Sequence, residues 1–522
     1  MTVPAAPVAH GRRVFRNTLF TGAVGIFSLF ANFFVIGAAA HHLGTNPFAV
    51  LTLTLAFSVS AGYLTIADLG LQSGVTRFIA DADGRGQRER TGEVVSSALA
   101  VLAVTAVVAV AILLTLSFVG SHIFTNFVDV SVVQKTVLLD DMRVLFMLFA
   151  AEAIFGLPGL AFLGVLQGLQ RFGWVKAIDL SRQILYTVLA MTVLLTGHGV
   201  IWFGAAMVSG TAFAAIGYAL AARLLCPEMR ISLRLIHRDA LRPLARFSGW
   251  VFLARVNGVI WSQMDTIILE VIVGISVLTG YSFAARLQSA VSYPLSLTAA
   301  AVVPAAANLL ALESRVRLRE LLVRGTRYTL ALSLPVTIAA LILARPLLIG
   351  WVGAKYASFA GPAQLFLTYQ LVTCAATIAS TMLVGMGRVR QVTTYVTIAV
   401  TVNLVISIVL AKPLGVSGVI IGTLVGYGIT GPLYIRLVLN ELSMGVGEFV
   451  RRAIVPIVPW ALLFAAVIAL TAFVVPPQGL IAVVLCCVPA AVIYVAGVTR
   501  FGMTGEERAA LFGFLLPAKP LR

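Results

Sequence analysis

Three ionisable residues lie inside a stretch that otherwise has the composition of a membrane helix. They are Arg255, Asp265 and Glu270, in the segment RVNGVIWSQMDTIILE. A charge at the centre of a bilayer costs about 2.5–3.5 kcal/mol even on insertion scales, so it is normally paired or faces a water-filled cavity. A guanidinium also presents several donors in a planar fork that suits phosphate. These residue types therefore indicate ion pairing or anion binding within the membrane.

The composition of the chain is that of an integral membrane protein. Hydrophobic residues make up 60% of the 522 residues and charged residues only 11%, whereas soluble domains carry about a quarter of charged residues. The net charge of +17 would suggest nucleic acid in a soluble chain, but basic residues of membrane proteins gather in cytoplasmic loops. We therefore expect no nucleic-acid partner. The four cysteines have no metal-binding spacing, and we expect neither a metal nor another cofactor.

Apolar stretches of about 20 residues are long enough to cross a bilayer as helices, and about fourteen can be counted. They predict an all-α polytopic membrane protein. Several connections are short and contain Gly or Pro, such as KPLG and PPQG, which is typical of turns between neighbouring helices. The candidate spans are 14–40, 47–80, 93–119, 141–169, 177–197, 200–224, 247–272, 280–310, 321–349, 361–387, 392–412, 417–437, 453–475 and 479–499.

Basic residues are distributed unequally between the two sets of connections. With a cytoplasmic N-terminus, most of the 37 Lys and Arg residues lie on the inside. This bias predicts a multi-pass protein of the cytoplasmic (inner) membrane with both termini cytoplasmic. No connection exceeds about 25 residues, which leaves no room for a soluble catalytic domain, so we expect that the protein is not an enzyme. The basic residues on the outside are Lys135, Arg143, Arg345, Lys355 and Lys412.

The chain contains an internal repetition. GLQRFGW at Gly168 and GMGRVRQ at Gly385 each precede a span, a turn and a second span. Repeated halves are common in secondary transporters, and the pattern predicts two pseudo-symmetric six-helix lobes followed by two C-terminal helices. The predicted parts are an N-terminal lobe (1–224), a cytoplasmic basic amphipathic linker expected to form an interfacial helix (225–246), a C-terminal lobe (247–440), and two extra transmembrane helices with a cytoplasmic tail (441–522).

Several segments resemble the polysaccharide-exporter, lipid-linked oligosaccharide flippase branch of the multidrug/oligosaccharidyl-lipid/polysaccharide superfamily. They are LGLQSGVTRFIADADGRGQRER, SQMDTIILEVIVGISVLTGYSFAARL and VVPAAANLL, and the most specific pattern runs from Asp265 to Leu287. The resemblance covers nearly the whole chain. It implies a V-shaped pair of six-helix lobes with a cavity lined by spans one, two, seven and eight. It also implies that polyprenyl-diphosphate-linked oligosaccharide repeat units are flipped from the cytoplasmic to the outer leaflet by alternating access, for export of surface polysaccharide.

Five residues are candidates for substrate binding. Arg255 would lie about 12 Å deep in span seven, and no partner at its depth is evident in the sequence. We expect it to contact the lipid diphosphate, with the alternative that it snorkels towards the cytoplasmic headgroups. Asn257, Gln263 and Gln288 offer hydrogen bonds to sugar hydroxyls or between helices, and Arg77 lies at the predicted cytoplasmic mouth of the cavity.

Two pairs of charges have simple structural interpretations. Asp265 and Arg286 lie at nearly the same depth on neighbouring antiparallel spans, which predicts an ion pair that locks this hairpin. Asp179 and Arg182 are three residues apart at the predicted start of span five, which predicts an intrahelical pair.

Two further acids are candidates for ion coupling, Glu152 deep in span four and Asp68 near the inner end of span two. The alternative for Glu152 is a protonated acid that bonds a neighbouring helix. Glu152 also leaves open a cation-coupled multidrug exporter of the same superfamily. A peptidoglycan lipid precursor flippase is a further alternative. The expected partners are the polyprenyl-diphosphate-linked glycan, the lipid bilayer, and a polysaccharide polymerase with its export machinery; we expect a monomer.

Overall fold

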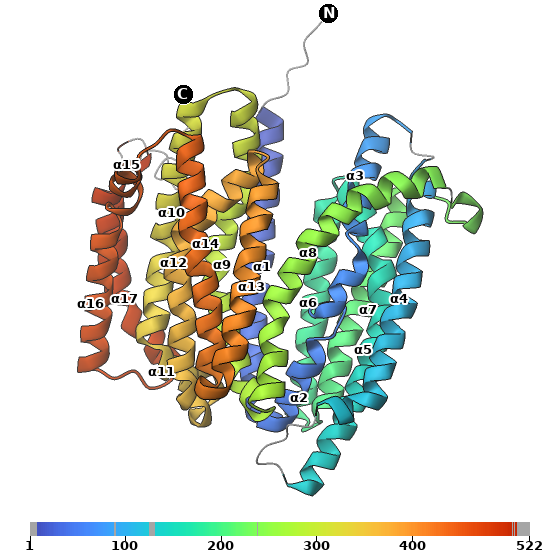
Figure 1. The fold of residues 1–522 in the computed structure, drawn as a ribbon, viewed down its shortest axis with the longest axis horizontal. Coiled ribbons are helices and arrows are strands. Elements are labelled where there is room, and N and C mark those ends of the chain that lie inside the picture. The colour runs from blue at the N-terminus through green and yellow to red at the C-terminus, as the bar shows by residue number, and fades with distance from the viewer. Residues whose placement is uncertain are drawn as a thin grey trace, which may run out of the picture. The chain divides into compact units, whose positions relative to one another are not determined.

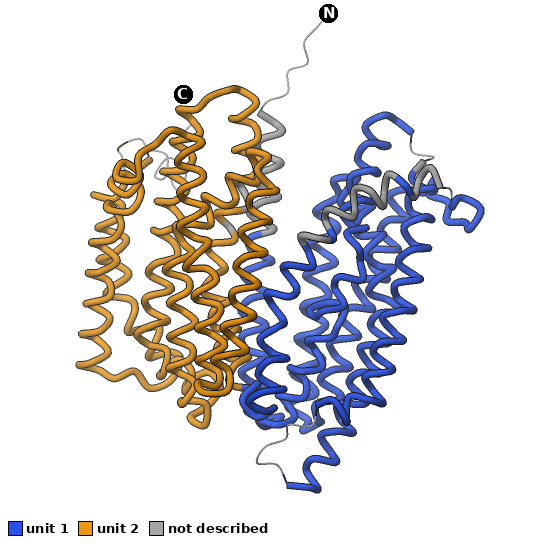
Figure 2. The backbone as a smooth tube through the Cα atoms, viewed as in Figure 1, with its two compact units in different colours: residues 1–279 blue, residues 280–522 orange. Residues whose placement is uncertain are grey.

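The described part of the chain is helical throughout. The structure is a computed structural model, and it describes residues 8–87, 90–124, 131–236, 238–503, 505, 507 and 508. Within these ranges every regular element is a helix, and none is a strand (Figure 1). The predicted all-α fold is therefore confirmed. The chain divides into two compact units, Met1–Thr279 and Gly280–Arg522 (Figure 2). The predicted lobe boundaries stay predictions.

Unit 1 contains eight α-helices and two short 3-10 helices among its described residues. In chain order they are α1 (Val8–His42), α2 (Thr45–Leu55), η1 (Tyr63–Asp68), α3 (Leu71–Gly84), α4 (Arg90–Ile123), α5 (Val132–Gly168), α6 (Phe172–Leu195), α7 (Val200–Leu225), η2 (Leu233–Leu235) and α8 (Arg238–Ile272).

Unit 2 contains most of α9 and all later elements. They are α9 (Ser276–Ala311), α10 (Arg315–Ile342), α11 (Ala344–Val352), η3 (Ala354–Phe359), α12 (Ala360–Gly385), α13 (Val389–Leu414), α14 (Val416–Glu441), α15 (Val446–Phe449), η4 (Val450–Ile454), α16 (Val458–Val474), α17 (Leu480–Gly497) and η5 (Val498–Gly502).

The helices are those of a multi-pass membrane protein. Among the described residues, 10 helices are long and apolar enough to cross a membrane, or up to 11 with the bent pair Val446–Ile454 and Val458–Val474. Each of these matches a predicted span. The three other predicted spans, 47–80, 247–272 and 280–310, correspond to a broken helix, to α8 and to α9. The total of fourteen stays a prediction.

The predicted span 47–80 is wrong as a single continuous helix, because it breaks after Leu55 and resumes at Leu71. Leu69 and Gly70 have φ values of 51° and 74°, in the left-handed region that a right-handed helix cannot contain. Earlier in the break, a Cβ on Gly62 would lie 2.3 Å from the Ala56 carbonyl oxygen. The chain therefore turns tightly here, where only glycine fits.

The first half of the predicted linker (225–246) differs from the prediction, whereas its second half, from Arg238, is helical. Its residues 226–236 form no interfacial helix, since they contain only η2. Cys226 precedes a proline and has φ −137° and ψ 72°, because the residue before proline is disfavoured in the helical region. The segment packs on α4 instead, where the Ser232 amide donates to Ser96 Oγ at 3.2 Å. The following residues begin α8, which continues as span seven.

Small residues bring the helices of unit 1 close together around α5. A Cβ on Gly159 would lie 2.7 Å from Ala215 Cβ of α7, and one on Gly164 would lie 2.9 Å from the Gln72 carbonyl oxygen of α3. Side chains such as Val165 and Leu102 fill the core beside these contacts. Helices in membranes commonly associate through such small residues, because backbones can then approach closely. The packing fixes the walls of the cavity described below.

In unit 2, α14 packs on α13 through its glycines. A Cβ on Gly418 would lie 2.1 Å from the Leu410 carbonyl oxygen, and one on Gly422 would lie 2.2 Å from Ser407 Oγ. These glycines recur every four residues in the sequence, as expected for a close-packed face.

We predict that Gly418→Ala destabilises the protein by about 1–3 kcal/mol, because the added methyl group overlaps fixed backbone. Gly428→Ala on the same helix is the matched control, since nothing lies within 4 Å of its Cβ. Thermal unfolding of the purified chain in detergent measures both. Equal unfolding temperatures for the two variants would contradict the close packing.

Candidate functional site

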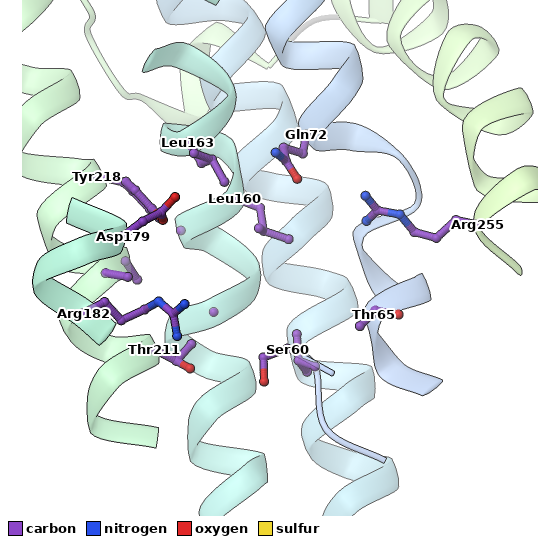
Figure 3. A pocket seen from close by; sticks show the side chains of 15 residues that line it. Ser60, Thr65, Gln72, Leu160, Leu163, Asp179, Arg182, Thr211, Tyr218 and Arg255 are labelled. Carbon is purple, nitrogen blue, oxygen red and sulfur yellow. The ribbon is translucent and has the colours of Figure 1, made fainter. Parts of the chain in front are cut away.

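Unit 1 contains an open-sided cavity of about 440 Å³ between its helices (Figure 3). This volume is in the range of small-ligand sites. Its walls come from α3, α5, α6, α7, α8, η1 and the turn before η1. Valine, leucine, alanine and glycine residues form its apolar part. Its polar lining residues are Ser60, Thr65, Gln72, Asp179, Arg182, Thr211, Tyr218 and Arg255.

Arg255 enters this cavity from α8 and forms an ion pair with Asp68. The Asp68 side chain is 0% exposed, whereas that of Arg255 is 31% exposed. Asp68 Oδ1 also accepts the backbone amide of Gln72 at 3.0 Å, so the same carboxylate caps the first turn of α3. The expectation that Arg255 has no partner is therefore wrong. The partner was missed because Asp68 lies at the helix break, which the hydropathy pattern hides.

Arg182 enters the cavity from α6 (Figure 3). This helix begins at Phe172 and not near residue 177, so Arg182 lies about 15 Å from the start of the helix. The predicted Asp179–Arg182 pair is wrong. Asp179 accepts Lys176 Nζ at 3.2 Å and the Tyr218 hydroxyl. Within the described ranges, the side chain of Arg182 has no ion pair or hydrogen bond.

Glu152 of α5 is buried beside the cavity, with 2% of its surface exposed. The hydroxyl of Thr211, on α7, donates to Glu152 Oε1 at 2.9 Å. This confirms the expected hydrogen bond between Glu152 and a neighbouring helix. The positive charge of Arg182 also acts on the carboxylate. Glu152 and Arg182 are therefore electrostatically linked without a direct bond.

The other predicted substrate residues do not line this cavity. Gln263 donates to the Ala61 carbonyl oxygen and so holds the turn between α2 and η1. Asn257 is half-buried on α8, and Arg77 is exposed on α3. Gln288 lies in unit 2, where it donates to Ser292 Oγ at 2.9 Å. The substrate roles of all these residues stay predictions.

The predicted Asp265–Arg286 pair would join α8 of unit 1 to α9 of unit 2, and it also stays a prediction. Among the described residues, no group of three His, Cys, Asp or Glu side chains is arranged to hold a metal ion.

Sequence reasoning missed five polar lining residues: Ser60, Thr65, Gln72, Thr211 and Tyr218. Hydroxyl and amide side chains are scattered through all the spans, so none of these five is conspicuous. Arg182 carried a usable signal, since a charge in mid-span is expensive. The sequence instead predicts a structural pair with Asp179, because the predicted span starts five residues later than α6.

Comparison with known proteins gives a family match and a set of similar folds. A family model described as polysaccharide biosynthesis protein matches residues 14–310. A search of curated proteins finds no match. Among solved structures, a lipid II flippase MurJ in an inward closed conformation is similar with a TM-score of 0.70 and 14% identity, over 92% of this chain and 98% of that chain.

Two MATE transporters are also similar, and the first of them belongs to the multidrug resistance MATE family. An inward-facing member of the MOP superfamily has a TM-score of 0.66 and 16% identity, over 80% of this chain and 94% of that chain. The Vibrio cholerae transporter VcmN in its bent form has a TM-score of 0.54 and 16% identity, over 83% of this chain and 97% of that chain. At these identities the matches establish the fold, which is that of MurJ and MATE proteins.

We predict that Arg255→Gln destabilises the protein more than Asp68→Asn. The first change leaves a fully buried carboxylate without its counter-charge, which costs about 3–5 kcal/mol. The second leaves Arg255 partly hydrated, and an asparagine at position 68 can still accept the Gln72 amide. The double variant Asp68→Asn/Arg255→Gln should therefore be close to Asp68→Asn alone. Thermal unfolding of the four proteins tests this; a double variant as unstable as Arg255→Gln would contradict it.

Proposed function

Because the chain belongs to the polysaccharide biosynthesis protein family, we propose that it flips polyprenyl-diphosphate-linked oligosaccharide repeat units for surface polysaccharide export. The family match and the fold support a flippase of the MOP superfamily. The substrate is our proposal. The observation that carries it is Arg255, a guanidinium held at the wall of a polar cavity inside a membrane unit.

Arg255 is well suited to bind the diphosphate. A guanidinium has five N–H donors, and the pair with Asp68 is made through Nη1, which leaves further donors for an incoming phosphate. Asp68 is fully buried, so it holds the guanidinium in place before the substrate arrives. Charge-assisted hydrogen bonds of this type are about twice as strong as neutral ones.

The uncharged polar residues of the cavity provide the contacts that a sugar requires. Ser60, Thr65 and Gln72 line the same wall region as Arg255, and hydroxyl and amide groups both donate and accept hydrogen bonds. In this account the diphosphate and its first sugars enter the cavity, while the polyprenyl chain stays in the lipid.

Transport is proposed to run from the cytoplasmic to the outer leaflet of the inner membrane by alternating access. An inside-negative potential favours outward movement of negative charge by about 2.3 kcal/mol per charge per 100 mV. Coupling to a second ion is therefore not required. A polymerase that joins repeat units at the outer face is the expected partner. The matched folds are those of transporters and flippases, which agrees with a role that makes no covalent bond.

Two alternative functions predict different outcomes. Glu152 is a buried acid beside a cavity, and a cation-coupled multidrug exporter needs such an acid. In that case Glu152→Gln would raise drug susceptibility, whereas our proposal expects no change. A peptidoglycan lipid precursor flippase would share the same diphosphate chemistry, and depletion of the protein would then cause lysis.

We predict that Arg255→Gln traps completed polyprenyl-diphosphate glycan in the cytoplasmic leaflet and lowers surface polysaccharide by about 10-fold or more, since a lost charged hydrogen bond costs about 1.5–3 kcal/mol. Mass spectrometry of lipid-linked glycans, combined with a membrane-impermeant oxidant, measures the trapped pool.

Arg223→Gln is the matched control, because Arg223 is exposed at the end of α7 and does not line the cavity. The double variant Asp68→Asn/Arg255→Gln separates transport from folding, since it removes the orphaned carboxylate. Normal surface polysaccharide in this double variant, at a normal membrane level, would remove Arg255 from the mechanism.

A further inference from the structure

The cavity of unit 1 contains a second guanidinium for which the sequence suggested only a structural role. Arg182 lies near the middle of α6 and lines the cavity that Arg255 also lines. Mid-membrane placement of a charge is expensive unless the charge has a partner or faces water. Within the described residues its side chain has neither an ion pair nor a hydrogen bond. The guanidinium therefore keeps its full set of donors for a ligand.

The acids that pair with cations in this part of unit 1 are Asp179 and Asp68, and both have partners other than Arg182. Asp179 accepts both Lys176 and the Tyr218 hydroxyl, and Asp68 accepts Arg255 and an α3 amide. These two acids lie on different helices, and each is balanced by its own cation. The charge of Arg182 is therefore the one in this cavity that no direct contact balances.

Glu152 is the remaining acid, and it lies close enough to Arg182 to interact with it through space. Its Oε1 is bonded by Thr211, and its carboxyl group is buried behind the cavity wall. An anion in the cavity would therefore reach Arg182 without having to break a direct bond. Glutamine at this position would keep an acceptor for Thr211 and remove the ionisable group.

Figure 3 shows Arg182 and Arg255 pointing into the same space from α6 and α8. We propose that Arg182 is an anion-binding residue that takes one phosphate of a diphosphate while Arg255 takes the other. A diphosphate fits this arrangement better than a monophosphate, because it presents two anionic groups to two separate forks. The diphosphate comes from a lipid headgroup or from the free ion. The assignment of the diphosphate to a lipid headgroup rests on the proposed function, whereas the existence of the anion site does not.

The test is equilibrium binding to the purified full chain in detergent, with two probes, inorganic pyrophosphate and a polyprenyl diphosphate. Arg182→Gln should weaken binding by about 10-fold or more, as expected for a lost charge-assisted contact. The affinity of Arg182→Lys should lie between those of Arg182→Gln and the wild type, because lysine keeps the charge and lacks the planar fork of donors. Glu152→Gln should bind at least as tightly as the wild type, because it leaves Arg182 in place and keeps an acceptor for Thr211. Arg223→Gln is the control of equal charge and should bind as the wild type.

Each outcome decides one point. Arg182-dependent binding of the polyprenyl diphosphate supports the lipid source, and Arg182-dependent binding of pyrophosphate alone supports the free ion. Wild-type affinity in Arg182→Gln for both probes, or no binding of either probe to the wild type, overturns the proposal. If Arg182→Gln does not fold, Arg182→Lys still decides, because unchanged affinity in this variant for both probes overturns the proposal.

The same variants separate this site from the proposed function. Arg182-dependent pyrophosphate binding in a protein whose deletion leaves lipid-linked glycans in their normal leaflets would keep the site and remove the flippase substrate. Glycan trapped by the deletion, together with an affinity that does not depend on Arg182, would keep the flippase and remove the site.

Discussion

The ion pair between Arg255 and Asp68 is the interaction on which the rest of unit 1 depends. Asp68 is fully buried, caps the first turn of α3 and holds the guanidinium of α8. A buried charge pair gains little net stability over apolar packing, yet loss of one partner is costly. Such a pair therefore fixes geometry more than it adds stability. Here it fixes where α8 meets the break after α2, and so it fixes one wall of the cavity.

The remaining charges of the cavity follow the same constraint. Asp179 is balanced by Lys176 and the Tyr218 hydroxyl, and Glu152 is bonded by Thr211. Among the described lining residues, Arg182 is the arginine whose side chain makes neither an ion pair nor a hydrogen bond. A membrane protein tolerates such an imbalance where the missing partner is supplied by a ligand or by water. Arg255 is held in place by Asp68, whereas Arg182 has no bonded acid. Together they provide one fixed and one available contact for a diphosphate.

The helical fold could be predicted from hydropathy, because an apolar stretch of about 20 residues has the length of a transmembrane helix. The helix break at Leu69 and Gly70 could not, since an apolar run looks the same whether it is straight or broken. That error hid Asp68 as the partner of Arg255. The start of α6 at Phe172 was also missed, and with it the depth of Arg182. Contacts between helices distant in the sequence, such as that of Thr211 with Glu152, follow from packing that periodicity does not encode.

The most direct test of the account is transport by the purified chain in proteoliposomes. A polyprenyl-diphosphate oligosaccharide would be placed in both leaflets, and its movement followed by its accessibility to a membrane-impermeant glycan-modifying enzyme outside. The account predicts that the wild-type protein makes the protected inner pool accessible, whereas Asp68→Asn/Arg255→Gln does not and Arg223→Gln does. Movement at the same rate with the cavity variant, or no movement with the wild type, would contradict it.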